Sequence, residues 1–115
     1  MHELSIVDAL IEQAQEEVER AGHAGRIRQL DLTIGRLSGV NCDSIRFAFE
    51  LLSPGTPLEG ARVQIAEPRP TCRCHGCHAR VEIDELTVTC PRCGSREVTI
   101  EGGRELLLQS IEIED

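Results

Sequence analysis

The chain has 115 residues, with 12 basic and 20 acidic residues and a formal net charge of −8, and every basic residue is arginine. This length allows one hydrophobic core plus a small module that cross-links stabilise, and it excludes a multidomain enzyme. The negative charge, with two Phe and no Tyr or Trp, argues against nucleic-acid binding, which depends on basic charge and aromatic stacking. With 40% hydrophobic residues, the chain still has enough aliphatic side chains for a folded core.

The first predicted element is an amphipathic helix over residues 4 to 21, which ends before Gly22. Its apolar residues share one face at helical spacing, with acidic residues on the other: Leu4, Val7, Leu10, Ile11, Ala14 and Val18. Residues 27 to 37 then alternate, with Leu30, Leu32 and Ile34 on one side, which predicts a half-buried strand.

A loop with three candidate N-caps follows at residues 38 to 44, and residues 45 to 52 have the spacing of a second helix. Alternation at residues 61 to 65 predicts a second strand, closed by Pro68 and Pro70. Residues 105 to 114 predict a third strand, in which Gln109 and Ser110 interrupt the alternation. We therefore expect a bulge or a sheet edge at these two positions.

The segment from residue 71 to about 96 differs in character, because it holds five of the six cysteines and few large apolar residues. The order of elements predicts an α+β fold, with two helices packed on a three-stranded sheet and an inserted four-cysteine zinc-ribbon module. The expected core is discontinuous, with a first part at residues 1–68 and a final strand segment at 99–115. The expected module occupies residues 69–98.

The N-terminal twenty residues carry six acidic residues and one arginine, the opposite of a secretory signal peptide. The aliphatic runs of the sequence are far too short to span a bilayer. We therefore expect a cytoplasmic protein without membrane contact, in which the thiols stay reduced and paired cysteines bind metal.

Two C-x-x-C pairs, Cys74 with Cys77 and Cys90 with Cys93, are separated by twelve residues. This is close to the spacing of a zinc ribbon whose tetrahedral site consists of four thiolates. Pro91 and Gly94 add turn-forming residues to the second pair. A segment with so small a core cannot fold on burial alone, so we expect structural zinc to stabilise it.

Other chemistries for these four cysteines remain open at this point. A rubredoxin-like iron site uses similar turns, but only the second pair has the trailing glycine and the chain lacks an aromatic core. A catalytic zinc needs a coordination position for water, which four thiolates do not leave. Redox chemistry by one C-x-x-C pair is a further alternative, although two pairs together favour a metal.

Four more residues are candidate ligands by their place in the sequence. Cys72 precedes the first pair and could compete for the metal, but is expected to be a spare thiol. His75 and His78 flank the first pair and could exchange with a thiolate, but are expected to be solvated turn residues. Cys42 is expected to be a half-buried side chain in the loop before the second helix.

The chain begins Met1-His2-Glu3. A free α-amine, a deprotonated His2 amide and the His2 imidazole can close adjacent chelate rings, and such in-plane nitrogen donors suit square-planar Ni(II) or Cu(II). The alternative is that these residues merely form the start of a helix, where the Glu3 carboxylate interacts favourably with the positive end of the helix dipole.

The whole pattern resembles the hydrogenase maturation nickel chaperone family, HypA/HybF. The resemblance covers the entire chain in order, and Met1-His2-Glu3 combined with two cysteine pairs at this length is its specific part. The other segments that carry it are Ile34-Gly35, Phe47-Ala48-Phe49-Glu50, Glu59-Gly60-Ala61, Cys90-Pro91-Arg92-Cys93-Gly94 and Ile111-Glu112-Ile113-Glu114.

The resemblance implies a non-enzymatic metallochaperone that binds Ni(II) at its N-terminus and assists nickel insertion into [NiFe] hydrogenase. The implied partners are the GTPase HypB and the precursor of the hydrogenase large subunit. His2 is then the side-chain nickel ligand, with donors from Met1 and Glu3, and Cys74, Cys77, Cys90 and Cys93 bind structural zinc.

Some members of the family add an acidic ligand from the loop after the first strand. The aligned residue here is Asn41, with Asp43 two positions further on. The rival to the whole interpretation is a zinc-ribbon interaction or regulatory module without nickel chemistry, and a third hypothesis is an iron electron carrier.

Overall fold

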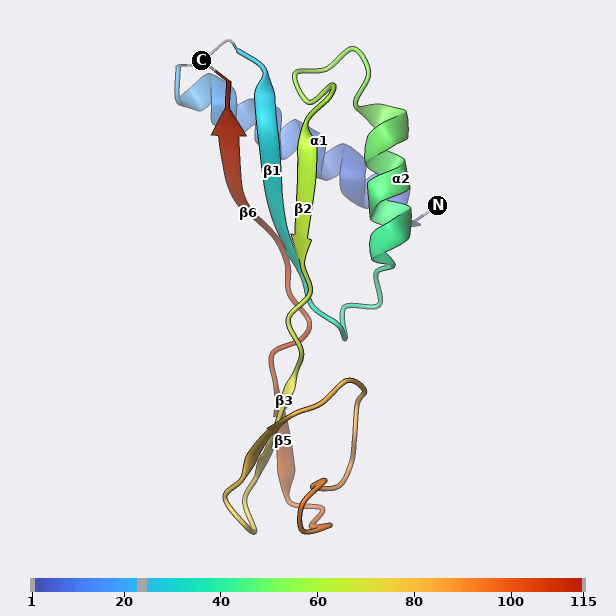
Figure 1. The fold of residues 1–115 in the computed structure, drawn as a ribbon, viewed down its shortest axis with the longest axis vertical. Helices are drawn as coiled ribbons and strands as arrows, with labels where there is room; N and C mark the ends of the chain where they lie inside the picture. The colour runs from blue at the N-terminus through green and yellow to red at the C-terminus, as the bar shows by residue number, and fades with distance from the viewer. Residues whose placement is uncertain (1, 23–24, 115) are drawn as a thin grey trace. The chain divides into compact units, whose positions relative to one another are not determined.

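The computed structural model describes residues 2–22 and 25–114. Their elements, in chain order, are α1 (His2–Arg20), β1 (Ile27–Ile34), α2 (Cys42–Leu52), β2 (Arg62–Ala66), β3 (Thr71–Cys74), β4 (Arg80–Glu82), β5 (Val98–Glu101) and β6 (Leu106–Ile113) (Figure 1). The strands form two three-stranded sheets, ordered β2-β1-β6 and β4-β3-β5. The predicted α+β class is confirmed. Within the described residues, no helix combines the length and hydropathy that a membrane crossing requires.

The chain divides into two compact units. Unit 1 contains Met1–Leu32, Val40–Ile65 and Leu107–Asp115, and unit 2 contains Thr33–Gly39 and Ala66–Leu106. By sequence, unit 1 holds five of the twelve arginines and thirteen of the twenty acidic residues, whereas unit 2 holds seven of each. The net charge of −8 therefore falls entirely on unit 1.

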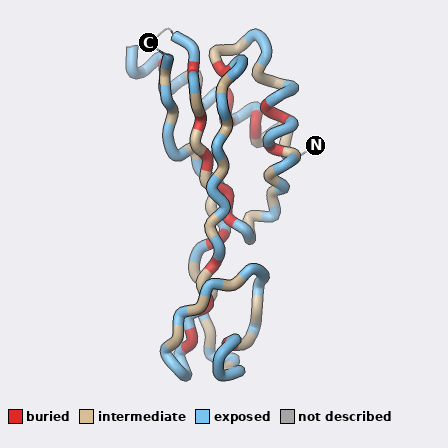
Figure 2. The backbone as a smooth tube through the Cα atoms, in the orientation of Figure 1, coloured by how far each residue is buried: buried red, intermediate tan, exposed pale blue. Residues whose placement is uncertain are grey.

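Unit 1 has the core that the helical and alternating patterns predict. Buried residues of the first unit (Figure 2) include Leu30 and Leu32 of β1 together with five residues of α1 and three of α2: Val7, Leu10, Ile11, Ala14, Val18, Ile45, Ala48 and Phe49. The two helices pack against each other. This burial explains the periodicity, because only the side chains on the inner faces leave water.

The start of α2 is set by Asn41, whose side-chain Oδ1 accepts a hydrogen bond from the backbone N–H of Ser44 at 2.9 Å. An N-cap of this kind satisfies one of the free N–H groups of the first turn. The helix consequently begins at Cys42 rather than at residue 45, so the expectation that Cys42 lies in the preceding loop is wrong. Strand β1 likewise ends at Ile34, three residues before the predicted end.

β6 lies at an edge of its sheet, as the interrupted alternation at Gln109 and Ser110 predicts. The Ser110 hydroxyl donates a 2.6 Å hydrogen bond to the carboxylate of Asp31 on β1, and the side-chain amide of Gln29 donates another at 2.8 Å. The bond from Ser110 and then that from Gln29 lower the pKa of Asp31 below its ordinary value, because both stabilise the carboxylate.

Unit 2 contains a sheet that the sequence pattern did not indicate. β3 pairs antiparallel with β4 and with β5, and Cys72 lies opposite Val81 on one side and Ile100 on the other. These strands are only three or four residues long, too short to show an alternation. Their short length explains why the sequence pattern did not predict them.

The segment Thr33–Gly39 belongs to unit 2 through backbone hydrogen bonds. The N–H of Gly35 donates to the carbonyl of Glu105 at 2.8 Å, and the N–H of Arg36 donates to that of Pro68 at 3.1 Å. A Cβ on Gly35 would overlap the backbone of Gly103. Glycine is therefore required at position 35 because two backbone segments cross there.

Candidate metal sites

The four cysteines of the two C-x-x-C pairs come together in unit 2. The Sγ atoms of Cys74, Cys77, Cys90 and Cys93 all lie within 4.8 Å of one another. The Cys74–Cys93 and Cys77–Cys90 separations are 3.6 and 3.8 Å. A tetrahedral ion with Zn–S bonds of about 2.3 Å requires sulfur separations of about 3.8 Å. The donor set and its spacing therefore fit a tetrathiolate zinc ion.

Backbone N–H groups point at the sulfur atoms of both pairs. Those of Gly76 and Cys77 donate to Cys74 Sγ at 3.3 Å, and that of Arg92 donates to Cys90 Sγ at 3.3 Å. The N–H of Cys77, followed by that of Gly76, lowers the pKa of Cys74 to about 6 against the opposing effect of burial. The turns therefore favour the thiolate form that metals bind.

Cys90 has a lowered pKa for the same reason, with the N–H of Cys93 as the largest cause and that of Arg92 next. The pKa of Cys93 is raised to about 12. The N–H of Ser95 acts to lower it, but hydrogen bonding to the Cys74 sulfur and burial outweigh that effect. Cys93 thus holds its proton more tightly than Cys74 does, as expected where neighbouring thiolates repel each other.

The two turns correspond residue by residue. Gly94, directly after the second ligand of its pair, has φ +77°, and His78 holds the same place in the first turn with φ 62°. Left-handed backbone is uncommon for a residue other than glycine. The first C-x-x-C pair lacks the trailing glycine of the second pair. The backbone turn is nevertheless the same, because His78 adopts the left-handed conformation that Gly94 adopts.

The histidines beside the first pair are both exposed. Two hydrogen bonds nevertheless fix the position of His75. Its Nε2 hydrogen-bonds to the Thr99 hydroxyl at 2.7 Å, and its backbone N–H donates to the Glu97 carbonyl at 2.8 Å. The expectation of a merely solvated turn residue misses these bonds, which join the first turn to β5. No local sequence pattern indicates the bond between His75 and Thr99, because the two residues are 24 positions apart in the chain.

Cys72 lies two residues before the first ligand on β3 and is 1% exposed. Its Sγ is not among the four that converge. Burial is the largest cause of the raised pKa of this thiol, and the neighbouring cysteines add to it. Cys72 is thus a packed, protonated thiol, in agreement with the spare role that the sequence suggested.

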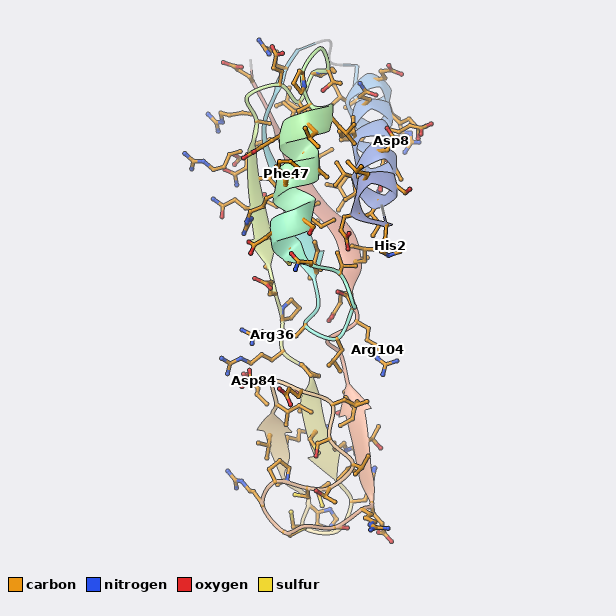
Figure 3. The ribbon with its side chains drawn as sticks, turned by 90° about the vertical axis from the view of Figure 1, so that its right-hand side faces the viewer. His2, Asp8, Arg36, Phe47, Asp84 and Arg104 are labelled. Carbon is orange, nitrogen blue, oxygen red and sulfur yellow. The ribbon has the colours of Figure 1, made fainter. Side chains whose placement is uncertain are left out.

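The N-terminal candidate residues lie at the start of α1. His2 is exposed and is the first residue of the helix (Figure 3). Glu3 is half-buried in the first turn. Met1 lies outside the described residues. The first N–H groups of a helix have no intrahelical acceptor, so the amide nitrogens of His2 and Glu3 are not needed to hold α1 together.

The loop position for which the resemblance suggested an acidic ligand has another role here. The Asn41 Oδ1 accepts the capping hydrogen bond of α2, and Asp43 is exposed in the first turn of that helix. The carbonyl oxygen of the Asn41 side chain is therefore already engaged by the protein backbone.

Comparison with known proteins gives one consistent result. A family model described as "HypA: Hydrogenase/urease nickel incorporation, metallochaperone, hypA" matches residues 1–113. The hydrogenase maturation factor HypA of Chlorobaculum tepidum is 39% identical over 114 residues, which cover 99% of this chain and 100% of that protein. The factor of the same name from Methanocaldococcus jannaschii is 31% identical over 121 residues, covering 99% and 98%.

Solved structures agree with the sequence relatives. The solution structure of the Ni metallochaperone HypA from Helicobacter pylori aligns with a TM-score of 0.65 at 26% identity, covering 96% of each chain. A second solution structure, of a HypA protein, gives a TM-score of 0.69 at 27% identity and covers 99% of this chain and 97% of that one. The similarity therefore extends over both units.

Proposed function

This chain belongs to the HypA family of hydrogenase maturation factors and is a nickel metallochaperone, and we propose that it captures Ni(II) at its N-terminus through His2. The family match over residues 1–113 carries the assignment. Nickel is the cargo of the protein, so its site has to bind the ion and later release it. An exposed terminal site suits that task better than a closed tetrathiolate.

The position of His2 supports this site. Its imidazole is exposed, and its amide is one of the N–H groups that the helix leaves without an acceptor. The positive end of the helix dipole disfavours a bare cation. Deprotonated amides at His2 and Glu3 would offset that charge, and the Met1 amine would complete a set of nitrogen donors suited to square-planar Ni(II).

We further propose that Cys74, Cys77, Cys90 and Cys93 hold zinc and that this zinc is structural. When bound, zinc would supply the cross-link that joins the two turns. All four ligands are protein thiolates, so the site offers no position for a reacting water, and we propose that the protein has no catalytic activity of its own. We propose that unit 1 is the nickel-binding domain and that unit 2, which includes β5 beside β3, is the zinc-binding domain.

The proposed partners are a HypB-type GTPase and the precursor of the [NiFe] hydrogenase large subunit, which receives the nickel. We place this work in the cytoplasm, where six cysteines stay reduced. The acidic unit 1 disfavours nucleic acid as a partner.

Nickel titration of the untagged protein tests the N-terminal site. His2→Ala and an N-terminal extension before Met1 should each abolish tight Ni(II) binding, because the first removes the imidazole and the second blocks the amine. Zinc content and circular dichroism should stay unchanged. His75→Ala is the matched control, since it removes an exposed imidazole near the cysteines instead, and nickel affinity should be retained.

Equal nickel affinity in all four proteins would place the ion elsewhere and would favour the zinc-ribbon interaction module without nickel chemistry. Loss of nickel binding in His75→Ala alone would transfer the assignment to the region beside the first cysteine pair.

A further inference from the structure

Unit 1 contains a hollow between α2 and the segment that leads into β2. This first hollow has a volume of about 400 Å³, and the apolar residues that line it include Phe49, Leu58 and Val63. Phe49 and Leu58 belong to the buried core, so an apolar side chain that enters the first hollow would contact core residues. The guanidinium-bearing residue of its lining is Arg46, on α2.

A second hollow, of about 440 Å³, lies beside the first. It is lined by Arg28 of β1 and Arg62 of β2, and Gly60 lines both hollows, so the two meet at this residue. Successive side chains of a strand point to opposite faces of its sheet. Arg62 and Val63 are consecutive on β2 and line different hollows. The start of β2 therefore separates an apolar hollow from an arginine-lined one.

The arginines of unit 1 gather at these two hollows. Arg26 borders the first hollow, because its guanidinium donates to the backbone carbonyl and to the carboxylate of Glu59 at 3.1 Å, and Glu59 also accepts from the N–H of Gly55 at 3.2 Å. Three of the thirteen acidic residues of unit 1 lie here, which leaves one arginine against ten acids elsewhere in the unit. The four of five arginines found at the hollows are Arg26, Arg28, Arg46 and Arg62.

Two of these arginines have no ionic partner. Arg28 lies 3.5 Å from the carboxylate of Glu112. Among residues 2–22 and 25–114, Arg46 and Arg62 form no ion pair, and of the three acids at the hollows only Glu50 forms none. Positive charge is therefore available to a ligand at this one place in an otherwise acidic unit.

β2 is an edge strand, because the sheet order β2-β1-β6 gives it a neighbouring strand on one side only. Figure 1 shows its other edge on the side of α2. An edge strand carries backbone N–H and C=O groups that have no partner in the sheet, and an extended segment can pair with them. The side chains of an added strand alternate between the two faces of the sheet, as those of Arg62 and Val63 do.

We propose that the open edge of β2 and the two hollows bind an extended segment of a protein partner in which apolar and acidic side chains alternate. The apolar side chains enter the first hollow, and the acidic ones meet Arg62 and Arg28 in the second. The proposal deepens the chaperone function given above and rests on it, because it names the surface with which the nickel-binding unit holds a protein partner.

The charge distribution favours a short acidic segment over other polyanions. A nucleic acid or an anionic membrane is a large, continuous array of negative charge, and it would also meet the ten acids of the rest of unit 1. A short segment meets the arginines alone. Its carboxylates match the planar guanidinium groups, which bind carboxylates through two parallel hydrogen bonds.

Calorimetric titration with the two proposed partners, the HypB-type GTPase and the precursor of the large subunit, tests the charge of the surface. Arg46→Gln/Arg62→Gln should raise the Kd of the partner that docks here about tenfold at low salt and make binding less dependent on salt concentration. The matched control, Arg96→Gln/Arg104→Gln, neutralises two exposed arginines of unit 2. It should stay within about twofold of the unaltered protein.

A second variant tests the first hollow, which Ala61 helps to line. Ala61→Leu places a larger side chain in the space and should raise the same Kd about fivefold. Ala9→Leu is the matched control, because it makes the same change at an exposed position of α1, and it should leave the Kd unchanged. Urea denaturation verifies that each variant is folded.

Nickel titration of the same proteins separates this surface from the proposed function. Weaker binding of one partner by both altered hollows, with nickel affinity retained, supports the proposal. Unchanged Kd values for both partners overturn the docking surface alone, as does an unaltered protein that binds nickel but neither partner.

Sedimentation analysis of the unaltered protein and of Arg46→Gln/Arg62→Gln examines a second copy as the occupant. Self-association that the arginine substitutions abolish would assign the surface to a second copy of this chain and overturn the proposal. An unaltered protein that binds no nickel overturns the proposed function and this surface with it.

Discussion

The Sγ atoms of Cys74 and Cys93 lie 3.6 Å apart although 19 positions separate the two residues in the chain. Each belongs to a different C-x-x-C turn, and the turns meet with all four sulfur atoms within 4.8 Å. Bringing four thiolates together without an ion is costly, because their negative charges repel one another. The arrangement is therefore expected to depend on a bound cation.

The first prediction concerns the identity of the ligands. Cys93→Ala should lose bound zinc and the ordered structure of unit 2, because three thiolates leave the tetrahedral shell incomplete. Cys72→Ala is the matched control, since it removes a neighbouring cysteine outside the cluster, and it should retain one zinc per chain. Metal analysis of the purified variants, together with thiol titration, gives the answer. A full equivalent of zinc in Cys93→Ala would contradict the assignment.

The second prediction separates capping from nickel binding at Asn41. Asn41→Ala should lower the free energy of unfolding by about 1 kcal/mol, because the N–H of Ser44 loses its side-chain acceptor. Nickel affinity should stay the same, since the Asn41 oxygen serves the helix rather than the ion. Urea denaturation and calorimetric nickel titration measure the two quantities.

Asn41→Asp is the control for this prediction, because a carboxylate caps a helix as well as an amide does. It should keep the stability of the unaltered protein. A marked gain in nickel affinity in this variant would instead bring position 41 into the nickel site.

The third prediction concerns acid stability at the β1–β6 contact. Hydrogen bonds from Ser110 and Gln29 lower the pKa of Asp31 in the folded protein. The resulting stabilisation is present above the unfolded pKa of about 3.9 and is lost as the pH falls through the lower folded value.

Ser110→Ala should therefore lower the free energy of unfolding by about 1 kcal/mol near pH 7, with a difference that vanishes in stronger acid. Urea denaturation of both proteins across this pH range measures it, with Ser5→Ala as an exposed control. A difference that is independent of pH would show that the carboxylate of Asp31 is not the acceptor that matters.

The fourth prediction concerns the backbone crossing at Gly35. Gly35→Ala should lower the free energy of unfolding by about 3 kcal/mol, because its Cβ would overlap the backbone of Gly103, which cannot rotate away as a side chain can. In Gly39→Ala the added Cβ meets no atom within 4 Å. The free energy of unfolding should fall by only about 1 kcal/mol, because alanine has to adopt φ +78°. Thermal and urea denaturation of the two variants should rank them in this order. Equal stabilities would contradict the crossing.

Several elements could be predicted because their signal is local. The face of α1 marked by Leu10 and Val18 and the alternation of Leu30 and Leu32 follow from burial on one side of a regular element. The irregularity at Gln109 and Ser110 correctly indicated an edge strand. The start of α2 was placed three residues too late, because three candidate caps stood in one loop and only the hydrogen bond of Asn41 decides among them.

The amino-acid sequence by itself determined the α+β class, the four clustered cysteines and, through Met1-His2-Glu3 with those pairs, the family. These features depend on residue type and on spacing along the chain. The tertiary structure decided what depends on residues far apart: the bond between His75 and Thr99, the need for glycine at position 35, and the packing of α1 against α2. Such relationships have no sequence signal, because they arise only when separate segments are folded against each other.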